Sequence, residues 1–201
     1  MNLITFFINS NFLSIENLAV IFSIGFVIFN AKGKIISWPL GIIGSALYIW
    51  VFINARIYGD ALLQFFYVLM GIYGWVQWRS AIKNDDVLPI ISAKLSQIIK
   101  YLLVGLLLVP IFGFLLDNRT DSDIPYLDAF TTVFSFIATF MMAKKVLENW
   151  LFWIIIDLTC IFIYTFKGLN STVVLFIIYT LMALYGFINW KLMLNKQKQN
   201  A

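Results

Sequence analysis

The chain has 201 residues, of which 62% are hydrophobic and 12% charged, with a formal net charge of +4. Soluble domains contain about 45–50% apolar and about 25% charged residues, so this composition excludes a water-soluble fold. Seven membrane-spanning helices of about 20 residues would use about 140 positions, which also excludes a large catalytic domain outside the membrane.

Apolar runs long enough to span a membrane follow one another along the whole chain. They must be helices, because an open strand edge is not tolerated in lipid. The runs lie at 13–31, 38–54, 60–78, 97–116, 126–143, 150–167 and 171–191. The sequence therefore predicts an all-α integral membrane protein with seven transmembrane helices.

Positive charges are distributed unevenly between the two sides of these spans. Eleven Lys and Arg residues fall on the side of the C-terminal tail and three on the other, which places the N-terminus outside and the C-terminus in the cytoplasm. We interpret the charges as topology signals, so no nucleic-acid partner is expected. The eleven are Lys32, Lys34, Arg79, Lys83, Lys94, Lys100, Lys144, Lys145, Lys191, Lys196 and Lys198, and the three are Arg56, Arg119 and Lys167.

An internal repeat becomes visible when the chain is shifted by 112 residues. Positions 16–79 then align with 128–191 without a gap, and fifteen of the sixty-four pairs are identical. The pairs that carry most weight involve uncommon residue types: Lys32/Lys144, Trp38/Trp150, Tyr67/Tyr179, Tyr73/Tyr185, Gly74/Gly186 and Trp78/Trp190.

The repeat predicts one membrane domain over 1–201, in which repeat one (13–79) and repeat two (126–191) each hold three spans and 97–116 is a linker helix. Three spans plus the linker return the chain to its starting side, so the repeats are parallel. Parallel repeats of this kind occur in transporters, with the substrate site near the membrane midplane. The 3+1+3 arrangement therefore favours transport.

Four tryptophans, Trp38, Trp78, Trp150 and Trp190, lie near the cytoplasmic ends of their spans, where an interfacial aromatic belt accounts for them. Trp50 and Trp153 lie deeper and fit a belt less well.

The third span places Gln64, Tyr67, Gly71 and Gly74 at helical spacing on one face. Small residues at such spacing usually let helices approach closely, so we interpret the glycines as packing residues. For Gln64 and Tyr67, a structural hydrogen bond and a ligand contact fit equally well.

Asp157 lies near the centre of the sixth span, where an ionised carboxylate costs about 2.5–3.5 kcal/mol on insertion scales. An intramembrane acid is a functional hypothesis by default, and a packing residue is the alternative. Trp150, Trp153 and Asp157 share one helix face, and two indoles beside a carboxylate suit a flat, cationic, heteroaromatic ligand. Repeat one has Trp38, Gly41 and Ser45 at the equivalent positions.

Three segments resemble the PnuC family of bacterial vitamin transporters. They are TrpProLeuGlyIleIleGlySerAlaLeuTyr at 38–48, TyrGlyAspAlaLeuLeuGlnPhePheTyrVal at 58–68 with TyrGlyTrp at 73–75, and the pattern formed by Trp150, Trp153 and Asp157. The resemblance implies a fold like the SWEET sugar transporters, uptake of nicotinamide riboside by facilitated diffusion across the inner membrane, and trapping by cytoplasmic phosphorylation. It also implies a homotrimer, and substrate contacts from Gln64 and Tyr67 in addition to the sixth-span residues. Trp50, which lies deeper than a belt residue, is predicted as a further contact.

Other functions remain open at this point. Relatives of the same family carry thiamine, which is also a cation. A membrane-embedded enzyme could use Asp117, Asp121 and Asp123 to hold a divalent cation, although a solvated acidic loop also accounts for them. The chain has no histidine and a single cysteine, Cys160, which we interpret as a packing residue. We therefore expect neither an enzyme nor a cofactor or metal.

Overall fold

The computed structural model describes residues 15–54, 58–83, 88–120, 122–166 and 170–199. In these residues it has seven helices and no strand longer than an isolated bridge, which confirms the all-α prediction. The helices are α2 (Ile15–Ala31), α3 (Ser37–Asn54), α4 (Tyr58–Lys83), α5 (Leu95–Arg119), α6 (Pro125–Ala143), α7 (Asn149–Phe166) and α8 (Asn170–Gln199). Residues 13–14, Arg56, Asp121 and Lys167, on which parts of the sequence analysis depend, lie outside the described residues.

Five of the described helices are long and apolar enough to cross a membrane: α3, α5, α6, α7 and α8. The apolar helix α2 is shorter, and α4, which carries Gln64 and Gln77, is not among the five. The prediction of seven crossings therefore depends, for α2 and α4, on their equivalence to α6 and α8.

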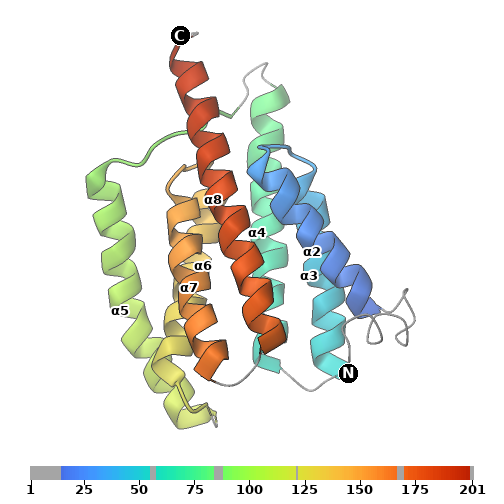
Figure 1. Ribbon diagram of the computed structural model, residues 1–201, viewed down its shortest axis with the longest axis vertical. Coiled ribbons are helices and arrows are strands. Elements are labelled where there is room, and N and C mark those ends of the chain that lie inside the picture. Colours follow the sequence, from blue (N-terminus) through green and yellow to red (C-terminus); the bar gives the residue numbers. More distant parts are fainter. Residues whose placement is uncertain (1–14, 55–57, 84–87, 121, 167–169, 200–201) are drawn as a thin grey trace. The chain divides into compact units, whose positions relative to one another are not determined.

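The chain divides into two compact units, one over Met1–Arg79 and one over Ser80–Ala201. The first contains α2, α3 and most of α4. In the second, α5 packs along α6, α6 along α7, and α7 along α8 (Figure 1). The division falls at the predicted end of repeat one, and the linker helix α5 belongs to the second unit.

The 112-residue repeat extends to the limits of the helices. Helices α2 and α6 end at equivalent positions, α3 and α7 begin and end at equivalent positions, and α4 and α8 begin at equivalent positions. These pairs are Ala31/Ala143, Ser37/Asn149, Asn54/Phe166 and Tyr58/Asn170. Most helix limits of the two repeats therefore correspond, as the predicted repeat leads us to expect, whereas α4 and α8 end at non-equivalent positions, Lys83 and Gln199.

The turns that end α2 and α6 are also the same. Lys34 N–H donates to Phe29 O and Gly33 N–H to Asn30 O, which is the Schellman pattern. Val146 and Lys145 make the equivalent bonds to Met141 and Met142 at the end of α6. The pattern needs a left-handed residue, which is Gly33 (φ 66°) in one repeat and Lys145 (φ 52°) in the other.

The segment before α5 is hydrogen-bonded to the turn between α6 and α7. Ile91 forms a parallel bridge with this turn, because its N–H donates to Lys145 O (3.0 Å) and Leu147 N–H donates to Ile91 O (2.8 Å). The Glu148 carboxylate accepts hydrogen bonds from Ser92 Oγ (2.6 Å) and Ala93 N–H (2.8 Å). The linker helix is thus tied to repeat two at its start.

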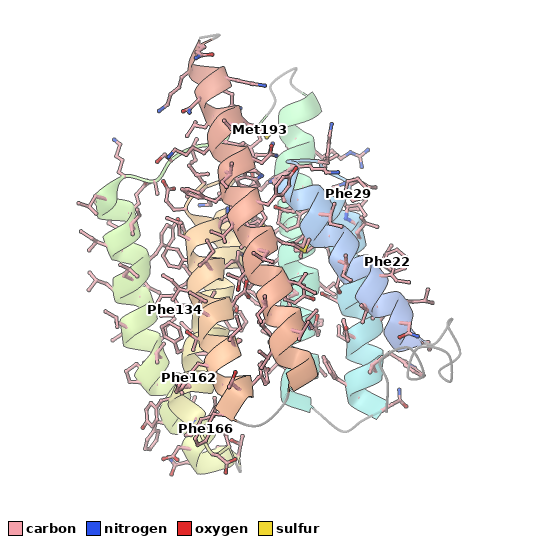
Figure 2. All side chains as sticks on the ribbon, viewed as in Figure 1. Phe22, Phe29, Phe134, Phe162, Phe166 and Met193 are labelled. Carbon is pink, nitrogen blue, oxygen red and sulfur yellow. The ribbon has the colours of Figure 1, made fainter. Side chains whose placement is uncertain are left out.

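Apolar side chains of α6 and α7 form the core of the second unit. The buried cluster comprises Val133, Phe134, Ile137, Ala138, Met141, Val146, Phe152, Ile156 and Cys160. Phe134 also meets α5, where Gly105 leaves space for its ring (Figure 2). The burial of Cys160 in this cluster confirms its interpretation as a packing residue.

Candidate functional site

Trp150, at the start of α7, is fully buried between α7 and α8. Its ring meets Trp190 edge-on, with centroids 5.4 Å apart and an angle of 87° between the planes. A Cβ atom at Gly186 would lie 2.7 Å from the Trp150 ring, so only glycine fits at that point of α8. These contacts make Trp150 a core residue of repeat two.

The first unit contains the same arrangement. Trp38 and Trp78 meet with centroids 5.4 Å apart at 88°, and a Cβ at Gly74 would lie 2.5 Å from the Trp38 ring. All four tryptophans are at most 2% exposed: Trp38, Trp78, Trp150 and Trp190. The interpretation of these residues as a lipid-facing aromatic belt is therefore wrong, because their rings pack inside the repeats and do not reach the lipid.

The glycines of the third span do pack helices together, as predicted. The ring of Trp38 covers Gly74, and the side chain of Ile42 lies where a Cβ of Gly71 would be. In α8, the residue equivalent to Gly71 is the small, buried Ala183.

Trp153 and Asp157 lie on the same face of α7, one turn apart. The Trp153 ring is partly buried against the α6–α7 core cluster, and its Nε1–H is buried with no hydrogen-bond partner among the described residues. Asp157 is 4% exposed, and no hydrogen bond or ion pair joins it to another described residue. The indole N–H groups of Trp38 and Trp150 are also buried without a hydrogen-bond partner among the described residues, so this feature alone does not distinguish Trp153. The buried acid Asp157 is the group whose burial requires an explanation, and a bound ligand supplies one.

The remaining predicted site residues belong to the first unit. Trp50, near the end of α3, is 54% exposed, and its carbonyl accepts a hydrogen bond from Asn54 Nδ2 at 2.7 Å. Gln64 and Tyr67, in the first half of α4, are half-buried. The structure thus brings Trp150, Trp153 and Asp157 together on α7 and places the other three on α3 and α4.

No basic residue occurs along the helical stretches around Asp157 in the second unit. The stretches 125–143, 149–166 and 173–190, which form the described length of α6, α7 and most of α8, contain no Lys or Arg. A carboxylate in an apolar, cation-free region attracts positively charged ligands and repels anions. The arrangement can bind a cationic ring, but it offers no partner for a phosphate.

In the first unit, Phe26 is a further residue of interest, and neither hydropathy nor a local motif marks it out. Its ring covers Gly41 on α3, where a Cβ would lie 2.8 Å from a ring carbon, and it packs against Trp38 at a centroid distance of 5.8 Å. The 112-residue comparison could have found it, since it pairs Phe26 with Ala138 and Gly41 with Trp153.

The acidic loop does not form a metal site in the part of the chain that the structure describes. Asp117 and Asp123 are exposed, Asp121 lies outside the described residues, and no group of three His, Cys, Asp or Glu side chains is close enough to hold an ion.

Comparisons with known proteins identify a family. Residues 13–192 match the family model described as "Nicotinamide mononucleotide transporter". The "Nicotinamide riboside transporter PnuC" of Escherichia coli (strain K12) is 29% identical over 182 residues, which cover 78% of this chain and 76% of that protein. The protein of the same name from Neisseria mucosa is 27% identical over 187 residues, covering 88% and 71%.

A solved structure has the same fold. The "Crystal structure of the Vitamin B3 transporter PnuC" matches with a TM-score of 0.76 over 96% of this chain and 86% of that chain, at 22% identity. The expected resemblance to this family is confirmed, and with it the all-α membrane-transporter fold.

Proposed function

Because the chain belongs to the nicotinamide mononucleotide transporter family, a family of transporters and not of enzymes, we propose that it carries nicotinamide riboside. The observation that carries this proposal is its similarity to curated relatives named as nicotinamide riboside transporters, of which it covers 76% and 71%. The family is described by the mononucleotide, so the choice between the two compounds needs a physical argument.

Charge distinguishes the two compounds. Nicotinamide riboside is a pyridinium cation, whereas the mononucleotide adds a phosphate. A buried Asp157 with no Lys or Arg along 149–166 favours the cation and penalises the phosphate. This supports the riboside as the substrate.

We place the substrate on the α7 face formed by Trp153 and Asp157, with the buried Trp150 beneath it. The indole of Trp153 would stack on the pyridinium ring, and its Nε1–H would supply a hydrogen-bond donor. Gln64 and Tyr67 of the first unit are proposed as further contacts because of the family resemblance, and Trp50 because of its depth in the predicted second span.

The ligand is tested by calorimetry on purified protein with a panel of related compounds. We expect nicotinamide riboside to bind, and the mononucleotide, nicotinic acid riboside and thiamine to bind at least tenfold more weakly. Each competitor tests one feature: the phosphate, the added carboxylate and the different cation. Tighter binding of thiamine would contradict the proposed substrate and favour the alternative within the same family.

We also propose that transport is facilitated diffusion, with trapping by phosphorylation in the cytoplasm. Nothing in the sequence resembles a phosphate-binding loop for ATP coupling. Proteoliposomes should therefore equilibrate the substrate without concentrating it, and should accumulate product only when they enclose a riboside kinase and ATP. Uptake beyond equilibrium driven by a proton or sodium gradient alone would contradict this mechanism.

The assembly is proposed as a homotrimer in a bacterial inner membrane, on the basis of the family resemblance. Mass measurement of the purified protein in detergent, with the bound detergent subtracted, tests it. A monomeric mass at all concentrations would overturn this part of the proposal.

A further inference from the structure

The two repeats differ in the sizes of the residues at one pair of positions, 26 and 41 in repeat one and 138 and 153 in repeat two. In repeat one, the first helix carries a large residue, Phe26, and the second helix carries Gly41. The Phe26 ring occupies the space in which a side chain at position 41 would begin, at 2.8 Å from its Cβ. An aromatic side chain at position 41 is thereby excluded.

In repeat two the sizes are exchanged. The equivalent positions hold Ala138 on α6 and Trp153 on α7. Ala138 is 0% exposed and belongs to the core cluster against which the Trp153 ring packs. Each repeat therefore has one aromatic side chain and one small residue at this pair of positions, but the aromatic comes from α2 in one and from α7 in the other.

Neighbouring contacts support the equivalence of the two pairs. Gly25 meets Leu40 and Gly44 meets Ser23 between α2 and α3. Their equivalents on α6 and α7 are all buried: Ile137 and Phe152, and Ile156 and Ser135. The equivalent positions therefore lie at helix contacts in repeat one and in the buried interior in repeat two.

We infer that Ala138 is a positioning residue for the substrate site. Its methyl group leaves the space that Phe26 fills in repeat one, and this allows the Trp153 ring to lie against α6 beside Asp157. By the same reasoning, repeat one has no site of this kind, because Phe26 closes it and Ser45 stands where repeat two has Asp157. The inference depends on the proposed function, since it assigns Trp153 to substrate binding.

The packing part is tested without any ligand, through thermal stability in detergent. Ala138→Phe should overpack the site and lower the melting temperature. The double variant Ala138→Phe with Trp153→Gly reproduces the repeat-one pair and should recover most of that loss. Ala129→Phe, at another fully buried alanine of α6, is the matched control and should not be rescued by Trp153→Gly. Equal loss in the single and double variants would overturn the inference.

The positioning part is tested by a double-mutant cycle in riboside affinity. Ala138→Phe should weaken binding at least tenfold in the parent, but less than twofold in a Trp153→Ala background, because it acts through Trp153. Ala129→Phe should leave affinity within twofold. Additive losses would show that Ala138 does not act through Trp153. If the parent itself fails to bind the riboside, the proposed function is wrong, while the stability cycle still decides the packing.

Discussion

Trp150, Trp153 and Asp157 lie on one face of α7 but have different surroundings, and these surroundings indicate different roles. Trp150 is enclosed by Trp190 and Gly186 in an arrangement that repeat one reproduces, so its role in folding needs no ligand. Trp153 and Asp157 have no counterpart of their kind in repeat one, where Gly41 and Ser45 occupy their positions. The proposed substrate contacts Trp153 and Asp157 are therefore the part of this face that the repeats do not share.

We expect Trp153→Ala to weaken riboside binding at least tenfold, about 1.4 kcal/mol, because stacking and apolar contact are lost together. Asp157→Asn should weaken it less than Asp157→Leu, because the amide retains a hydrogen-bond acceptor. Phe162→Ala is the control on the same helix, since Phe162 is 65% exposed near the end of α7 (Figure 2). Calorimetry on folded variants measures all four, and equal affinities of Trp153→Ala and Phe162→Ala would remove this face from the site.

A second prediction at this scale concerns Lys145 in the turn after α6. Burial lowers the pKa of its ammonium group from 10.5 to about 8. The unfolded chain therefore binds more protons between about pH 8 and 10.5, so the Lys145 contribution to stability becomes more favourable as pH rises through this window. In Lys145→Met this rise should be smaller, whereas Lys144→Met, at an exposed neighbour, should retain it. Melting temperatures across this pH range provide the test, and identical pH profiles of the parent and Lys145→Met would contradict it.

At the scale of elements, hydropathy locates the helices but not their ends. The seven apolar runs all lie within helices apart from a few end residues, yet α4 continues to Lys83 and α8 to Gln199. Those last turns are polar because they extend beyond the apolar region, and a hydropathy pattern cannot follow them. The repeat is the stronger predictor, because a 112-residue shift relates helix limits and turns in both halves.

The prediction that the four equivalent tryptophans form an aromatic belt is wrong for a physical reason. Distance from a span end is the same for an indole that faces lipid and for one that faces a neighbouring helix. The sequence does contain the distinguishing signal, since Gly74 and Gly186 recur with the tryptophans at one spacing. Asp157 stays a prediction that rests on the cost of an ionisable group at mid-membrane depth, and Trp153 stays one because it shares the helix face of Asp157.

Glu148 supports a prediction about the linker helix. Its carboxylate bonds to Ser92 and Ala93, and hydrogen bonds to charged groups contribute about 1.5–3 kcal/mol. We expect Glu148→Ala to lower the melting temperature and to speed hydrogen exchange of the Ile91 and Leu147 amides, with Glu148→Gln intermediate. Asp123→Ala, at an exposed acid elsewhere, should change neither. Unchanged exchange in Glu148→Ala would show that the bridge holds without the carboxylate.

At the scale of the whole molecule, the uneven distribution of basic residues predicts the orientation. Single cysteines at Asn118 and Lys198 in a Cys160→Ala background should react differently with an impermeant reagent. On intact cells we expect labelling at 118 only, and at both positions after permeabilisation. Labelling at 198 without permeabilisation would reverse the orientation.

The exchange of volumes between Phe26/Gly41 and Ala138/Trp153 has a consequence for how a duplicated chain can diverge. A single substitution at either position passes through an intermediate with two aromatic rings in one space or with none. The first is overpacked by about 1–3 kcal/mol and the second leaves a cavity. Conversion of the pair in one repeat into the pair of the other therefore requires two coupled changes, and each change alone costs stability. The difference between the repeats at this point is thus difficult to reverse by single substitutions.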